Sequence, residues 1–270
     1  MSVVRHALQA RWVGYFALAV VFAIITSLFG LWQWDRRTQA VVEIERVEIN
    51  FDQEPAAWSA LMGPSQGWSD DLRWRSVMIE GEYRSEFTTL VRTRPRIGQV
   101  GFEVLVPFAT GDGEVIVVNR GWVPTGANED EPDLIPPAPV GAVTVVGKLF
   151  PGEPEIPGRS APSGQVATIH LPTMASETGL AIDQRAYLAL VSETPPVSPT
   201  PLLIDRPVAD EGPHLSYTFQ WFLFGILGFI AWGYLLREDY RGESGGSKKR
   251  ARLSDQDVED ALLDEWEKTH

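Results

Sequence analysis

A histidine followed by aromatic residues at helical spacing is the feature of this sequence best suited to chemistry. His214 lies in a stretch without Asp, Glu, Lys or Arg. On a helix His214, Tyr217 and Trp221 stand at i, i+3 and i+7 and share one stripe, with the small residues Thr218 and Gly225 alongside. A neutral imidazole is a common axial ligand of haem iron, and an aromatic flank suits a planar macrocycle. His214 is therefore a candidate ligand of haem iron.

A second candidate pair lies at the end of an earlier uncharged stretch. Gln33 and Arg36 stand three residues apart and can face the same way on a helix. An arginine there could hold a propionate carboxylate through two hydrogen bonds. The alternatives stay open: Arg36 can simply extend to water from the bilayer edge, and His214 can be a solvated residue in an ordinary interfacial aromatic belt.

The residue types and motifs of this sequence argue against other common kinds of chemistry. There is no cysteine, and the four methionines are scattered, which disfavours thiol redox chemistry, c-type haem attachment and copper(I) delivery. No hydrolase, Walker or dinucleotide motif is present. No two histidines lie at metal-ligand spacing; they are His6, His170, His214 and His270. We therefore expect a protein that is not an enzyme.

Two uncharged stretches must position these residues. They run from 12 to 34 and from 212 to 236, and each exceeds the roughly 20 residues that a helix needs to cross a bilayer. A signal peptide would have a shorter apolar region and a small-residue cleavage site, whereas the first stretch ends in bulky aromatic residues. We predict transmembrane helices over residues 12–34 and 214–236.

Charge predicts the orientation of these spans. Basic residues precede the first span and follow the second, which favours cytoplasmic segments at 1–11 and 237–270, although Arg36 and Arg37 oppose this assignment. The segment 35–213 would then lie outside a bacterial plasma membrane. It holds 14 basic and 26 acidic residues, a net charge of −12, which argues against nucleic acid as a partner.

The segment between the spans is typical of a β-rich domain. A strand or extended lead followed by a short helix is expected over 41–67, and a helix from Leu171 to Leu180. Strands are expected at Trp74–Tyr83, Phe87–Thr93, Val100–Phe108, Glu114–Asn119, Ala142–Leu149, Val166–His170 and Arg185–Val191. The prediction is an extracytoplasmic α+β, barrel-like domain flanked by two transmembrane helices.

Two further expectations concern a turn and the tail. A β-run ends at Asn119-Arg120-Gly121, so we expect Arg120 at the rim of the domain, where it either satisfies carbonyl groups or contacts a partner. In the tail, Val258, Ala261, Leu262 and Trp266 fall near one helical face, which suggests a short amphipathic helix or a solvated, partly helical segment.

Three motifs together resemble the Surfeit locus protein 1 family of cytochrome c oxidase assembly factors. They are Gly30-x-Trp32-Gln33-x-x-Arg36, Val118-Asn119-Arg120-Gly121-Trp122-Val123-Pro124 and His214-Leu-x-Tyr217-x-x-Gln220-Trp221, in family order. The resemblance implies a factor that assists insertion or stabilisation of haem a in the catalytic subunit, with His214 as the haem ligand. Gln33, Arg36, Tyr217, Gln220 and Trp221 carry over as motif positions.

Two other functional classes compete with that expectation. One is a permanent accessory subunit of the oxidase, or of a respiratory supercomplex, that does not handle haem. The other is an envelope sensor, for which the 34 residues from Arg237 to His270 contain no recognisable output module.

Overall fold

The computed structural model describes residues 3–127 and 131–267, with side chains described as far as residue 242. The chain divides into two compact units, Met1–Val41 with Asp210–His270, and Val42–Ala209. The first unit contains α1 (Val3–Ala7), the first part of α2 (Ala10–Asn50) and α5 (His214–Glu267). The second contains the strands.

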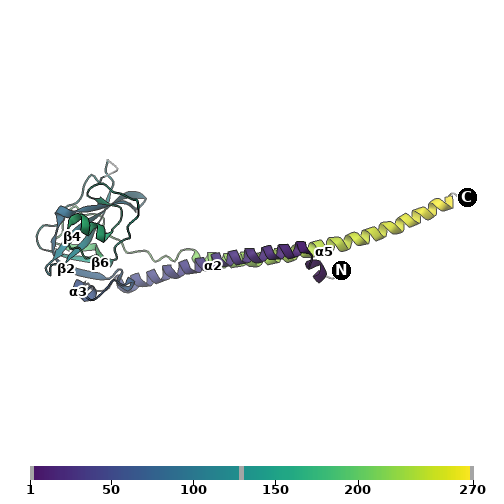
Figure 1. The fold of residues 1–270 in the computed structure, drawn as a ribbon, viewed down its shortest axis with the longest axis horizontal. Helices are drawn as coiled ribbons and strands as arrows, with labels where there is room; N and C mark the ends of the chain where they lie inside the picture. The colour runs from purple at the N-terminus through teal and green to yellow at the C-terminus, as the bar shows by residue number, and fades with distance from the viewer. Residues whose placement is uncertain (1–2, 128–130, 268–270) are drawn as a thin grey trace. The chain divides into compact units, whose positions relative to one another are not determined.

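Two helices of the first unit are long and apolar enough to cross a membrane: α2, and α5 over the stretch His214–Gly242. Only 17% and 11% of the residues in their apolar windows are buried within the structure, whereas the core helix of a soluble protein would be mostly covered. Close contacts such as Gly225 against Thr26 show that the two helices lie side by side (Figure 1). This agrees with the two predicted spans as helices.

Helix α2 extends well beyond the predicted span, and the extended lead expected from residue 41 is wrong as far as Asn50. The last turns of α2 are held by polar contacts to the β-rich unit. The Asn50 amide donates to the carbonyl oxygens of Asp71 and Arg73 at 2.6 and 2.9 Å. The Trp74 indole donates to the Glu43 carboxylate at 2.8 Å. These tertiary contacts favour helix over the strand-like alternation of the local sequence.

Five strands of the second unit close into a ring, which confirms the barrel-like prediction. The ring order is β2-β6-β8-β5-β4, and β4 returns to pair with β2. Strands β1, β3 and β7 extend the sheet beyond this ring. The bounds are β1 Ala56–Ala57, β2 Ser76–Tyr83, β3 Thr89–Arg96, β4 Gln99–Thr110, β5 Val115–Pro124, β6 Val143–Phe150, β7 Gln165–Val166 and β8 Tyr187–Thr194.

The barrel interior is built from β-branched and aromatic side chains that alternate inward along the strands. Val77, Val104, Phe108 and Ile116 are fully buried in this core. A second apolar cluster lies under α4 (Leu171–Thr178), with Val117 and Ile169 among its members. Six of the seven predicted strands have an observed counterpart of similar length, and the predicted helix 171–180 is confirmed as Leu171–Thr178. The strand predicted over Val166–His170 is wrong beyond Val166, where the two-residue β7 ends.

Short elements complete the unit. Helix α4 has a proline in its first turn and ends at Gly179, whose φ of 70° provides the left-handed cap. The remaining short helices are α3 (Trp58–Leu61), η1 (Asp70–Leu72) and η2 (Ser85–Phe87). The amphipathic face expected around residues 258–266 involves side chains outside the described residues and stays a prediction.

Candidate functional site

The structure brings His214 and Gln33 together, although they are 181 residues apart in the chain. Nδ1 of the imidazole lies 2.7 Å from Oε1 of the Gln33 amide. Since an amide oxygen can only accept, Nδ1 carries the proton and Nε2 carries the lone pair. No hydrogen bond to Nε2 is found among the described residues, so this nitrogen remains able to bind a metal ion.

Small residues beside this pair let the two helices approach closely. A Cβ on Gly30 would lie 3.1 Å from the Phe222 ring, and one on Gly225 would lie 2.9 Å from Thr26 Oγ1. The buried Thr218 hydroxyl donates to the His214 carbonyl at 2.9 Å, which satisfies it within its own helix. The helix positions that carry His214 and Gln33 are therefore fixed by packing on the same faces.

The aromatic members of the predicted stripe have different roles. Trp221 stacks on Phe29 with ring centroids 4.9 Å apart and an interplanar angle of 27°. One face of this indole is thus used in helix packing and not free as a cofactor wall. Tyr217 is 44% exposed, on the surface of the helix one turn beyond His214. Gln220 is also exposed.

Gln33 and Arg36 lie three residues apart on α2, as expected, but no hydrogen bond between them is found among the described residues. Arg36 donates to the side chain of Gln39 at 3.1 Å, and Gln39 in turn donates to Asp35 at 2.8 Å. The next residue, Arg37, forms an ion pair with Glu211 at 2.7 Å, three residues before His214. Arg37 is therefore the arginine linked to the segment leading into α5. Its acidic partner, just before the second span, is the signal that sequence reasoning missed.

The opposite end of the helix pair carries a second polar cluster. Asp239 accepts hydrogen bonds from His6 Nε2 at 2.9 Å and from the Trp12 indole at 3.2 Å, and also pairs with Arg11. An apolar hollow of about 370 Å³ lies nearby, with Trp12 and Trp232 in its wall. His6 is fully buried in this cluster, which links the N-terminal segment to α5.

Arg120 is not at the rim of the domain as predicted but in its interior, fully buried. Its guanidinium donates to Glu193 at 2.6 and 3.3 Å and to the Pro136 carbonyl at 2.8 Å. Tyr83 donates its hydroxyl to the same carboxylate at 2.9 Å. Burial and the neighbouring Glu193 raise the pKa of the Tyr83 phenol well above its ordinary range. This cluster is a structural one, with every member paired.

The expected end of the strand at residues 119–121 is wrong, because β5 continues to Pro124 and Gly121 lies at a shift in its register with β4. Gly121 has a φ of 124°, a region open essentially to glycine, and a Cβ there would lie 2.5 Å from the Leu202 carbonyl oxygen. Trp122 and Leu202 exchange both backbone hydrogen bonds at 2.8 Å. Arg96 also donates to the Leu202 carbonyl, at 3.0 Å. The motif therefore holds the segment that leads toward α5.

A multinuclear or protein-only metal centre is not supported within the described residues, where no group of three or more His, Cys, Asp or Glu side chains could hold an ion. The chemistry that His214 can offer is that of a single axial ligand. Such a nitrogen suits a metal whose other positions are filled by a macrocycle.

Comparison with known proteins agrees with this layout. A profile of the SURF1 family matches residues 20–226. The chain is 31% identical over 245 residues to an uncharacterized SURF1-like protein of Mycobacterium bovis, covering 87% of this chain and 89% of that one. A SURF1-like protein of Monosiga brevicollis is 27% identical over 242 residues, covering 83% and 88%.

A more distant relative has a functional name. The cytochrome oxidase assembly protein SHY1 of Saccharomyces cerevisiae is 28% identical over 109 residues, which cover 39% of this chain and 28% of that protein. The extent of the family match, which covers the whole barrel and reaches into both apolar helices, decides the assignment: this chain belongs to the SURF1 family.

Proposed function

We propose that this protein takes part in the assembly of cytochrome oxidase and that it holds haem a transiently at His214 while the catalytic subunit matures. Membership of the SURF1 family and the likeness to the yeast cytochrome oxidase assembly protein support the first part. The observation that carries the second part is the 2.7 Å hydrogen bond between His214 Nδ1 and Gln33.

That hydrogen bond gives the imidazole the form a metal ligand needs. Histidines that bind metals commonly donate their other ring N–H to an oxygen acceptor, which fixes the tautomer and the orientation of the ring. Gln33 plays this part across the two helices. Because the amide is uncharged, it orients the imidazole and leaves Nε2 as a neutral ligand. Haem a, when bound, would supply the redox-active iron centre that the oxidase requires.

The neighbouring groups suit a site that releases its cargo. Tyr217 is 44% exposed, and in the ion pair of Arg37 with Glu211 the two side chains are 27% and 47% exposed. A partly exposed pair of this kind contributes little to stability, so its arginine can exchange partners at low cost. A propionate carboxylate would be an alternative partner for Arg37.

The proposed location is a bacterial plasma membrane, with both termini in the cytoplasm and the barrel outside. The two apolar helices support this orientation, as do the basic residues that flank them on the terminal sides: Arg5 and Arg11 before the first, and Arg237, Arg241, Lys248, Lys249, Arg250 and Arg252 after the second. We further propose the catalytic subunit of the oxidase as the direct partner, because that is where haem a must be delivered.

An absorption spectrum of the purified protein tests the haem site. Full-length protein is purified from cells that make haem a, as wild type, His214→Ala and His170→Ala. His170 is the matched control, since its Nδ1 bonds Thr173 at 2.7 Å within the β-rich unit. The expected result is a haem band in wild type and His170→Ala that is lost in His214→Ala. An equal band in all three rejects His214 as the ligand.

A deletion strain tests the assembly role separately. We expect a lower haem a signal in membranes, restored by wild type and much less by His214→Ala. Stoichiometric copurification of this protein with mature, active oxidase would contradict a transient role and favour a permanent accessory subunit.

A further inference from the structure

The apolar hollow between α2 and α5, near Asp239, has the dimensions of a lipid chain. Its volume is about 370 Å³. Its lining includes small residues from both helices, namely Ala19, Gly228 and Ala231. The hollow has room for about twelve methylene groups, if each takes roughly the 30 Å³ of a water molecule. That is most of one acyl chain.

The polar groups in the wall of this hollow do not call for a polar ligand. The Trp12 indole donates to Asp239 at 3.2 Å, and the Trp232 indole donates to the carbonyl oxygen of Trp12 at 3.1 Å. Tyr15 is 50% exposed and packs its ring edge-on against Trp12, with centroids 5.5 Å apart. The rest of the lining is aliphatic, aromatic or glycine. An apolar occupant therefore fits the hollow.

The hollow extends over about half of the predicted span. On α2 its lining begins at Trp12 and ends at Phe22, which is about 15 Å along a helix. On α5 it begins at Gly228 and ends at Leu235. Since the hydrocarbon of a bilayer is about 30 Å thick, this length corresponds to one leaflet. A transmembrane helix of a partner would need a groove along the whole span, whereas an acyl chain lies within one leaflet.

A cation with unused donors lies at the end of the hollow next to Asp239. Arg11 directly precedes the first lining residue, and its side chain is 52% exposed. Among the described residues it hydrogen-bonds through Nη2 alone, to Asp239. That carboxylate also accepts from the His6 ring and the Trp12 indole, which offsets its negative charge. Because a guanidinium has five N–H donors, most of those on Arg11 remain for an anion.

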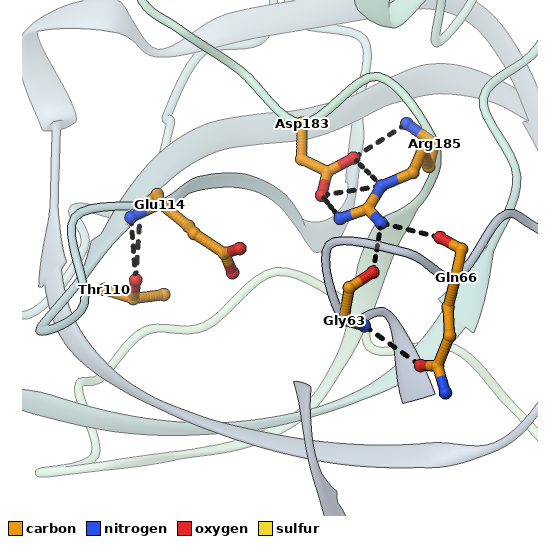
Figure 2. A network of polar contacts seen from close by, with 6 residues as sticks. All are labelled: Gly63, Gln66, Thr110, Glu114, Asp183 and Arg185. Carbon is orange, nitrogen blue, oxygen red and sulfur yellow. Dashed lines mark hydrogen bonds and ion pairs between the residues drawn. The ribbon is translucent and has the colours of Figure 1, made fainter. Parts of the chain in front are cut away.

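Arg185 in the β-rich unit shows the opposite case. Its Nε donates to Asp183 at 3.0 Å, and its Nη2 donates to the same carboxylate. Its Nη1 donates to the carbonyl oxygens of Gly63 and Gln66 at 2.9 and 2.7 Å. Figure 2 shows these bonds converging on one guanidinium. All three nitrogens of Arg185 are thus bonded within the fold, unlike those of Arg11.

We propose that this hollow binds an anionic phospholipid, with one acyl chain between the helices and the phosphate at Arg11. Guanidinium groups bind phosphate oxygens through paired hydrogen bonds, and basic residues beside transmembrane helices select anionic headgroups. The flanks 1–11 and 237–241 hold four arginines and two acidic residues, so the local charge is positive. The inference rests on the proposed membrane location and does not require haem binding at His214.

Lipid titration of the full chain, followed by native mass spectrometry, tests the headgroup. Protein freed of lipid in detergent is titrated with phosphatidylglycerol, or with phosphatidylcholine that carries the same chains. Wild type should bind one phosphatidylglycerol about fivefold more tightly than phosphatidylcholine. Arg11→Gln should abolish this preference. Lys248→Gln removes the same charge about 20 Å further along α5 than Leu235 and should keep the preference.

Filling the hollow tests the acyl chain separately. Ala231→Phe places a ring where the chain would lie and should weaken binding of both lipids about tenfold, because the chain loses its packing contacts. Ala17→Phe is the matched control, since Ala17 is exposed on α2 and is not among the residues that line the hollow, and it should stay within about twofold.

Three results would each overturn the lipid site: equal affinity of wild type for the two lipids, an unchanged preference in Arg11→Gln, or an equal loss in Ala17→Phe and Ala231→Phe. Recovery of the full chain outside the membrane fraction of cells would be a different failure. It would overturn the proposed membrane location and the lipid site together.

Discussion

Two polar clusters of this molecule use charge and hydrogen bonding in opposite ways. In the barrel, Arg120, Glu193 and Tyr83 are buried, and the guanidinium is bonded to both a carboxylate and a carbonyl group. Between the helices, His214 uses one ring nitrogen for Gln33 and leaves the other without a described partner. The first arrangement fixes a fold, and the second prepares a group for something that is not part of the chain.

Substitution of Arg120 should have the largest effect, because it disrupts the fully paired cluster in the barrel. Arg120→Met leaves Glu193 buried without its cation, which should lower the free energy of unfolding of the β-rich unit by about 3–5 kcal/mol. Thermal and denaturant unfolding measure this. The double variant Arg120→Met, Glu193→Met should recover most of the loss. The exposed pair of Arg206 with Asp52 provides the control, and Arg206→Gln should cost less than about 1 kcal/mol.

Gly121→Ala comes next and separates backbone geometry from charge. The new Cβ meets the Leu202 carbonyl oxygen at 2.5 Å in a backbone conformation disfavoured for alanine, so we expect a loss of about 1–3 kcal/mol. Gly67→Ala is the control, because a Cβ at Gly67 meets nothing within 4 Å. Equal stability of the two variants would show that the contact with Leu202 does not constrain this part of β5.

Gln33→Leu tests the pair between the helices, in which His214 keeps one ring nitrogen for a ligand. Loss of the acceptor for His214 Nδ1 should weaken haem binding by roughly tenfold to a hundredfold, the usual effect of removing the hydrogen-bond partner of a ligand. The stability of the barrel should not change. Haem titration followed by absorbance measures the affinity, with Gln39→Leu as control, since Gln39 bonds Arg36 and Asp35 instead. Unchanged affinity in Gln33→Leu would mean that Gln33 does not orient the ligand.

Glu103 should give the smallest effect and tests whether partly buried pairs behave like Arg120. Burial raises the pKa of the Glu103 carboxyl, against the opposing influence of the Arg94 guanidinium. Its stabilising contribution is therefore complete below the unfolded-state pKa of about 4.3 and is lost as pH rises through the folded-state value. Glu103→Gln should flatten this part of the stability-versus-pH curve. Glu82→Gln, at an exposed site, should leave the curve unchanged.

Local patterns were enough to predict the strands and the apolar helices, because β-branched runs between turn residues and long uncharged stretches are properties of neighbouring residues. The helix at 41–50 was missed because Val42, Ile44, Val47 and Ile49 are separated by glutamates in a way that suits a strand as well as a helix. Contacts of Glu43 and Asn50 with distant residues decide between the two.

The site was predictable only in part, for the same reason. His214 could be selected from its place beside an uncharged stretch, but its partner Gln33 lies 181 residues away, and local spacing could show only that Gln33 and Arg36 share a helix face. Arg120 was placed at a rim because Glu193, 73 residues later, could not be recognised as its partner. Whether a polar side chain is bonded within the fold, or can still bind another molecule, depends on residues distant in sequence and not on its own type.

Closure of the barrel also affects how neighbouring molecules meet this domain. The strands at the two ends of the sheet, β1 and β7, have only two residues each, so they offer little template for intermolecular strand pairing. Crowded copies on one membrane surface should therefore resist edge-to-edge aggregation. Other proteins are then recognised through surface side chains and not through strand pairing. Single surface substitutions can change that recognition while the barrel stays closed.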